Sequence, residues 1–210
     1  DIGAGTGNLA AKLLERGLKV TAVEPNDAMR ELGMKHTAHL GTICWVEGTG
    51  ESTGLSNGEF KLVGYGSSFN VVNAYRALCE VARILDTDGW FACMWNHRDL
   101  QDPIQSQIEG IIRSEVPGYG YGSRREDQTS TIDKSGLFGP VLHKEAFVVH
   151  RQLISDVVEA WYSHATLKRQ AGDRFSSIIE SIAKYLRSLD VDVITTRYVT
   201  RSWMAPVLKP

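Results

Sequence analysis

Hydrophobic residues along the first hundred positions follow a helical period and a strand-like pattern in turn. Residues 8–16 carry Leu9, Leu13 and Leu14 at helical spacing and end at Gly17, and the run that follows is short and β-rich. This alternation repeats as far as residue 95. Strands are predicted over residues 19–24, 42–48, 60–65 and 90–95, and helices over residues 8–16, from Asn26 or Asp27 onward, and over 71–85.

The second half of the chain changes character. After a glycine- and tyrosine-rich loop, a strand, two helical stretches and a long β-rich run follow one another. The predicted elements are a helix over 103–115, the loop 117–126, a strand over 146–152, helices over about 155–170 and 173–188, and a strand over 193–203. Strands separated by helices need right-handed crossovers, which place helices on both faces of a parallel sheet. We therefore predict a doubly wound α/β fold, mostly parallel, with an antiparallel C-terminal edge.

Composition adds limits rather than a function. The 210 residues, 42% of them hydrophobic, are enough for one core, so we expect a single domain, with residues 100–150 and 155–190 as substrate-side insertions. The net charge of −2 gives no overall attraction to nucleic acid or to an anionic membrane. Three cysteines without C-x-x-C spacing suggest neither a disulfide framework nor a metal site. The cysteine usage fits a reducing cytoplasm, and we expect a monomer or a homodimer.

The opening segment DIGAGTGNLA carries the first chemical signal. Glycines at positions 3, 5 and 7 let the backbone approach a ligand closely, as in nucleotide-binding turns between a strand and a helix. The NAD-type pattern G-x-G-x-x-G fails, because Asn8 occupies the third glycine position. Asp1 would repel a pyrophosphate and attract a cation such as the sulfonium of S-adenosylmethionine. Glu24, at the end of the second strand, is placed to accept hydrogen bonds from two ribose hydroxyls.

Four motifs in order resemble the class I S-adenosylmethionine-dependent methyltransferases, in particular the small-molecule branch that includes the trans-aconitate and ubiquinone/menaquinone types. They are DIGAGTG, VEP, EGTGES and LDTDGWFACMWN, and they span residues 1–98. The motif DIGAGTG usually ends an apolar strand that follows a helix. Since the printed chain opens on that motif, we expect that this strand and helix are missing.

The resemblance implies roles for individual residues. Asp1, Gly3 and Gly5 would face the methionine part of the cofactor, Glu24 the ribose and Met29 the adenine. Relatives often carry an aspartate at the position of Thr49, so Glu51 or a backbone carbonyl is expected to replace it, with the Gly50 amide reading the adenine ring. The expected cofactor residues are Asp1, Gly3, Ala4, Gly5, Glu24, Pro25, Met29, Thr49, Gly50, Glu51, Ser67 and Phe69. The expected substrate residues are Asn70, Asn96, Arg98 and Tyr119.

Methyl transfer from an activated sulfonium depends mainly on orientation, and in some cases on a base. His97, just after the predicted strand 90–95, is the candidate base, and Arg98 is the candidate partner of an anionic substrate. Each candidate also has a purely structural interpretation. His97 and Arg98 would cap the strand and pair with Asp99 or Asp102 at the surface, and Asn70 would cap the next helix.

The sequence leaves the role of one loop open, and it weighs against some classes of function more than others. The loop that carries Tyr119 and Tyr121 is either a substrate lid or a flexible connection.

An NAD(P)-dependent oxidoreductase is disfavoured by the glycine spacing and Asp1. A nucleic-acid methyltransferase is disfavoured because the chain has no N/D-P-P-Y/F signature and no basic stripe. A non-catalytic cofactor-binding domain is compatible with every motif.

Overall fold

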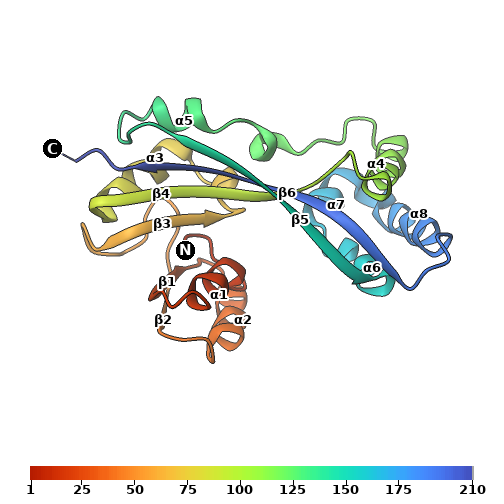
Figure 1. Ribbon diagram of the computed structural model, residues 1–210, viewed down its shortest axis with the longest axis horizontal. Helices are drawn as coiled ribbons and strands as arrows, with labels where there is room; N and C mark the ends of the chain where they lie inside the picture. The colour runs from red at the N-terminus through yellow and green to blue at the C-terminus, as the bar shows by residue number, and fades with distance from the viewer. Residues whose placement is uncertain (210) are drawn as a thin grey trace. The chain divides into compact units, whose positions relative to one another are not determined.

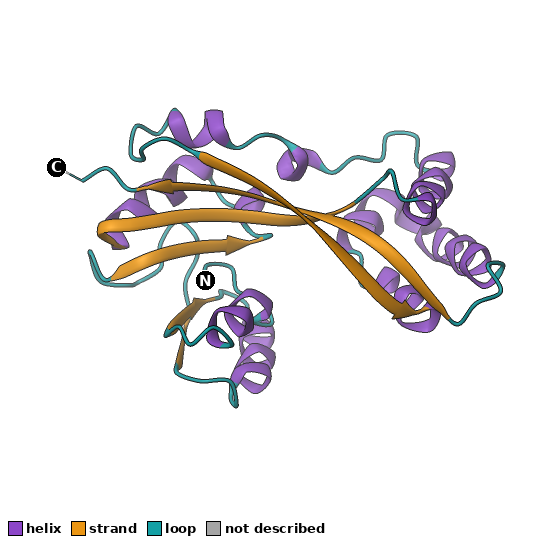
Figure 2. Cartoon of the chain, in the orientation of Figure 1, coloured by secondary structure: helices purple, strands orange, loops and turns teal. Residues whose placement is uncertain are grey.

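The computed structural model describes residues 1–209, and the chain divides into two compact units. Unit 1 contains Asp1–Trp95, Glu126–Glu145 and the chain from Arg201 onward, and unit 2 contains Asn96–Arg125 and Ala146–Thr200. Figures 1 and 2 show the elements of both units. In chain order they are α1 (Asn8–Leu14), β1 (Val20–Val23), α2 (Asp27–Thr37), β2 (Ile43–Val46), β3 (Phe60–Gly66), η1 (Phe69–Val71), α3 (Ala74–Ile84), β4 (Leu85–Arg98), α4 (Pro103–Glu115), η2 (Gly122–Arg125), α5 (Thr129–Asp133), β5 (Leu142–Leu153), α6 (Ile154–Tyr162), α7 (Ala165–Ala171), η3 (Gly172–Arg174), α8 (Phe175–Arg187) and β6 (Val193–Pro206).

The strands confirm the predicted α/β class. β1 pairs with β2 in parallel, and β3 pairs with β4 in parallel. Ile2 links the two pairs, since it forms a parallel bridge with Val23 and its amide donates to the Gly64 carbonyl at 2.9 Å. The larger sheet has the order β3-β4-β6-β5, and β6 runs opposite to β4 in Figure 1. From β2 through β4 the strands thus pair in parallel, and the C-terminal strand β6 adds the predicted antiparallel part.

Short polar side chains set where the helices begin. Asn26 accepts from the Met29 amide at 3.0 Å and caps α2. Asn73 accepts from the Arg76 amide at 3.1 Å and caps α3, so the predicted cap at Asn70 is wrong. Asp102 caps α4 in the same way. A side-chain oxygen satisfies an amide that has no partner inside the helix, and the chain uses this device at three helices.

Two predicted boundaries differ from the structure for local reasons. α3 ends at Ile84 and β4 begins at once, so the DTDG segment lies within the strand and does not separate it from the helix. The helix predicted over 155–170 is divided into α6 and α7, because His164 caps α7 through a bond from the Leu167 amide to its Nδ1 atom at 3.1 Å. No helix within residues 1–209 combines the length and apolarity needed to cross a membrane.

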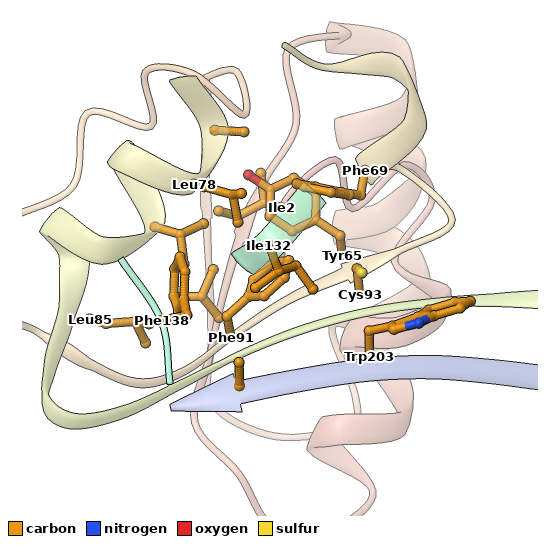
Figure 3. Packing of buried hydrophobic residues seen from close by; sticks show 14 of the residues in the cluster. Ile2, Tyr65, Phe69, Leu78, Leu85, Phe91, Cys93, Ile132, Phe138 and Trp203 are labelled. Atoms are coloured by element: carbon orange, nitrogen blue, oxygen red, sulfur yellow. The ribbon is translucent and has the colours of Figure 1, made fainter. Parts of the chain in front are cut away.

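The core of unit 1 is rich in aromatic rings, as Figure 3 shows. Tyr65 and Phe69 meet edge to face at 5.3 Å between ring centroids, and Phe91 lies 5.4 Å from both Phe69 and Phe138. Aromatic pairs at such distances stabilise a core beyond the area they bury. This cluster holds the carboxyl end of β3, which carries part of the candidate site.

Candidate functional site

A cleft of about 380 Å³ lies in unit 1 beside the glycine loop. The carboxyl ends of β1 and β3 supply residues to it, as expected for the ligand edge of an α/β sheet. Its lining residues come from the loop, from the segment after β1, from the 49–51 turn and from the chain around η1. They are Ile2, Gly3, Gly5, Glu24, Pro25, Met29, Thr49, Gly50, Glu51, Tyr65, Ser67, Ser68, Val71 and Val72.

The glycine loop has a backbone that other residues rarely adopt. Gly3, Gly5 and Gly7 have φ values of 64°, 57° and 83°. A Cβ atom at Gly3 would lie 2.6 Å from the Cβ atom of Ser68, which is closer than non-bonded carbons approach. Both the left-handed backbone and the contact require glycine at position 3. The loop can therefore present backbone to a ligand without a side chain in between.

Glu24 is the buried carboxylate of the cleft, with 6% of its surface exposed. Its Oε2 atom accepts from the Gly5 amide at 2.8 Å, and its Oε1 atom accepts from the Asn26 amide at 2.9 Å. These bonds join the glycine loop to the end of β1 through one side chain. Each carboxylate oxygen retains a further lone pair, so Glu24 can accept two more hydrogen bonds from a ligand.

The opposite wall is fixed by the segment that resembles an adenine-binding motif. The Tyr65 hydroxyl donates to the Gly50 carbonyl at 3.2 Å, and burial raises the pKa of Tyr65, so the hydroxyl stays protonated as a donor. The Oε1 atom of Glu51 accepts from the Asn73 amide at 2.6 Å. The turn is thereby held to β3 and to the start of α3.

Ser67 is one of two residues other than glycine with positive φ among the described residues, at 68°. This backbone conformation costs a residue with a side chain about 1 kcal/mol or more, and such strain collects at functional sites. Ser67 lies at the end of β3 and lines the cleft. Its amide donates to the Met94 carbonyl at 2.8 Å, which holds the turn in place.

Ser67→Gly is expected to raise the free energy of unfolding by about 1 kcal/mol, because glycine adopts positive φ without the Cβ penalty. Urea unfolding measures this value. Ser68→Gly is the control, since Ser68 has a φ of −115° and its hydroxyl donates to the Ile2 carbonyl at 2.5 Å. That variant should lose stability. A destabilised Ser67→Gly protein would show that the turn is not strained.

Three of the expected cofactor residues do not line the cleft. Phe69 is only 2% exposed and packs in the aromatic core, so the expectation of cofactor contact is wrong for this side chain. Ala4 packs in the small core beneath α1. The Oδ2 atom of Asp1 accepts from the Ala10 amide at 2.9 Å, which holds the first turn of α1. The remaining nine expected residues line the cleft together.

A second cavity, of about 180 Å³, lies within unit 2, and we call it the basic cavity. Asn96, His97 and Arg98 line it from the end of β4. Three arginines and no carboxylate are among its lining residues. The full set is Asn96, His97, Arg98, Tyr121, Arg124, Arg125, Gln152, Val157, Ala160, Trp161, His164 and Tyr198.

The Arg98 side chain is buried, with 8% of its surface exposed, and it has several partners. Its Nη2 atom donates to the Glu109 Oε2 atom at 3.1 Å and to the Tyr121 hydroxyl at 2.6 Å. Its guanidinium lies 4.5 Å from the ring centroid of Trp161. The surface interpretation, in which Arg98 pairs with Asp99 or Asp102, is therefore wrong. His97 is also buried, at 6% exposed.

His164 contributes a neutral ring to the basic cavity. Burial, together with the charges of Arg98 and Arg124, lowers its pKa to about 4. Its ring stacks on Trp161 with 4.9 Å between centroids. Because Nδ1 accepts from the Leu167 amide, the proton of the neutral ring belongs on Nε2. His164 thus provides an uncharged N–H donor.

Two expected substrate residues take structural roles. Tyr119 is 2% exposed and belongs to the core of unit 2, so the expectation that it contacts substrate is wrong. The Asn70 Oδ1 atom accepts from the Trp95 indole at 2.9 Å, and Asn70 lines neither the cleft nor the basic cavity. Tyr121, two residues beyond Tyr119, lines the cavity instead. Its hydroxyl bonds to Glu109, and its ring lies 3.9 Å from the Arg125 guanidinium.

The basic cavity also contains residues that the sequence alone did not assign to a site. In the sequence, the positive charge of Arg124 and Arg125 suggests contact with an acidic substrate. The adjacent Glu126 and Asp127 instead favour a solvated loop. In the structure both arginines line the basic cavity, and Asp127 faces Trp203 in unit 1, where it accepts from the indole at 3.1 Å. The other lining residues include Trp161, Gln152 and Tyr198, and no motif in the sequence indicates a site at these positions.

Known proteins match the chain most clearly over its first half. The family described as a methyltransferase domain matches residues 1–93. An uncharacterized methyltransferase of Mycobacterium bovis is 38% identical over 99 residues, which are 47% of this chain and 40% of that protein. The chain thus spans less than half the length of this relative.

Two further proteins extend the match. The ubiquinone/menaquinone biosynthesis C-methyltransferase UbiE of Zymomonas mobilis is 32% identical over 163 residues, covering 70% of this chain and 66% of the relative. The structure of a putative type II methyltransferase from Anaeromyxobacter dehalogenans has a TM-score of 0.73 at 15% identity, covering 100% of this chain and 89% of that one. The motifs, the fold and these matches agree, and the chain belongs to the class I S-adenosylmethionine-dependent methyltransferases.

Proposed function

We propose that this protein transfers a methyl group from S-adenosylmethionine to an oxygen or nitrogen atom of a small molecule. The observation that carries the proposal is the charge of the cleft in unit 1. Its lining residues include two carboxylates, Glu24 and Glu51, and no lysine or arginine. A pyrophosphate would find no counter-charge there, whereas a cationic cofactor is favoured.

The cleft residues divide naturally along such a cofactor. The loop of Gly3 and Gly5 would take the methionine part, where backbone can approach closely. Glu24 would accept the two ribose hydroxyls on its remaining lone pairs. Met29, which is 44% exposed, would cover the adenine, with Gly50 and Glu51 at its edge. S-adenosylmethionine supplies the activated methyl group, and the protein supplies binding and orientation.

The residues at the end of β4 are proposed to contact the acceptor. Asn96 and Arg98 would orient the acceptor, and His97 would take its proton where the acceptor atom is a hydroxyl or an ammonium group. A carboxylate acceptor is already ionised and needs no base. The preference for oxygen or nitrogen separates this proposal from the C-methyltransferase named among the relatives.

The test measures cofactor binding and turnover separately. Calorimetry with S-adenosylmethionine and with NADH should show binding of the first alone, and a panel of small acids, alcohols and amines should yield S-adenosylhomocysteine with at least one acceptor. Binding of NADH alone would overturn the proposal in favour of an oxidoreductase. Tight cofactor binding without turnover across the panel would favour a non-catalytic domain. With an accepted alcohol or amine, His97→Gln should lower kcat and leave cofactor affinity unchanged.

A further inference from the structure

We infer that the basic cavity of unit 2 binds the oxyanion group, a carboxylate or a phosphate, of a small organic molecule with a short apolar body. The inference of an anion site depends only on the residues that line the cavity. Its identification with the methyl-acceptor site rests on the proposed function, and the acceptor would then be an organic acid or a phosphate ester.

Positive charge exceeds negative charge among the residues that line the cavity. Arg98, Arg124 and Arg125 line it, and no carboxylate is among its lining residues. The acidic partner of Arg98, Glu109, is already shared. Its Oε2 atom takes Arg98 and the Tyr121 hydroxyl, and its Oε1 atom takes Arg113 at 2.8 Å. Charge in a partly enclosed site interacts more strongly than at an open surface, so an excess of arginine favours an incoming anion.

Two arginine donors of the cavity lack an acceptor. The Nη1 atom of Arg98 is buried and has no hydrogen-bond partner among residues 1–209. Buried polar atoms nearly always have partners, and a charged donor left alone is costly. The Nε atom of Arg124 is in the same situation. An oxyanion in the cavity would satisfy these donors with charge-assisted hydrogen bonds.

The Arg98 guanidinium is already oriented before any ligand arrives. Trp161 lies on its face, and Glu109 with Tyr121 holds its edge. A fixed guanidinium loses little freedom on binding and reads the planar geometry of a carboxylate better than a flexible lysine would. The neutral His164 adds an N–H donor that brings no further charge.

The shape of the cavity limits the rest of the ligand. Val157, Ala160 and Trp161 give it an apolar wall, and its volume is about 180 Å³. Typical sites for drug-sized ligands are larger, at roughly 300 to 1,000 Å³. The cavity therefore suits one anionic group on a small hydrocarbon or aromatic body.

The test titrates the full chain, without cofactor, with benzoate, phenyl phosphate and the neutral analogue benzamide. At least one anion should bind, and benzamide should bind about ten-fold more weakly or not at all, because it offers the arginines no charge. The two anions distinguish a carboxylate site from a phosphate site. Equal affinity for benzoate, phenyl phosphate and benzamide, or no binding of either anion, would overturn the inference.

Matched variants separate the cavity from general charge. Arg124→Gln should weaken anion binding about ten-fold, since it removes one of the three lining charges. Arg169→Gln removes the same charge from an exposed residue of α7 outside the cavity and should leave binding unchanged. Arg98→Lys keeps the charge near Glu109 and should also weaken binding. Equal losses in Arg124→Gln and Arg169→Gln would indicate a diffuse surface effect and contradict the site.

The anion titration tests the basic cavity separately from the proposed methyl transfer. Anion binding with no S-adenosylmethionine binding would keep the basic cavity and remove the proposed function. Methyl transfer by a protein whose cavity binds neither anion would do the reverse.

Discussion

Glu24→Gln is expected to weaken S-adenosylmethionine binding by about 100-fold. The substitution replaces one acceptor oxygen by an amide donor, so the variant cannot accept both ribose hydroxyls while it also accepts the Gly5 and Asn26 amides. Hydrogen bonds to a charged group contribute roughly 1.5 to 3 kcal/mol each, and the loss of one or two accounts for this factor. Isothermal titration calorimetry measures the change.

Glu47→Gln is the matched control for this change. Glu47 follows β2 as Glu24 follows β1, but its side chain is 74% exposed and lies 3.7 Å from Arg30, outside the cleft. Its removal should leave the affinity unchanged. Thermal unfolding of both variants separates a lost ligand contact from a collapsed loop. An unchanged affinity in a folded Glu24→Gln protein would remove Glu24 from the cofactor site.

His164→Asn is expected to flatten the dependence of stability on pH. The folded protein holds the pKa of His164 at about 4, against 6.5 for a free histidine, so the unfolded chain binds the proton more readily. Stability contributed by the neutral ring is therefore fully present above pH 6.5 and is lost as the pH falls toward 4. The linkage corresponds to about 3 kcal/mol across this window.

Urea unfolding of the two proteins at pH 7 and at pH 4 measures this difference. Asparagine suits the position, because its side-chain oxygen can accept from the Leu167 amide and preserve the cap of α7. The variant should resemble the original protein at pH 7 and lose about 3 kcal/mol less on acidification. Parallel pH curves for the two proteins would show that His164 does not titrate in this range.

The residues that line the cleft of unit 1 could be predicted because the signals for them are local in sequence. Glycine spacing, the carboxylate at the end of β1 and the turn around Gly50 each follow a strand, and the ends of parallel strands meet at one edge. The expected cofactor contact of Phe69 is wrong because its direction is not set by local sequence. A residue just after β3 points either to the ligand or to the core, and nothing in a single sequence decides between these directions.

The basic cavity was only partly predictable. His97 and Arg98 follow a clear strand, but Arg124, Trp161 and His164 meet them only through the packing of helices whose pairing leaves no sequence signal. Tyr119 and Tyr121 have the same neighbours and the same spacing from glycines, yet one is buried in the core and the other lines the cavity.

Glu24 is held in place before any ligand arrives, by the amides of Gly5 and Asn26. A carboxylate in water must shed solvent and settle into one rotamer when a ligand binds, whereas this one already has its rotamer and its loop fixed. A ligand that bonds to Glu24 therefore meets a carboxylate that is already oriented, and its binding is expected to need little rearrangement of the glycine loop.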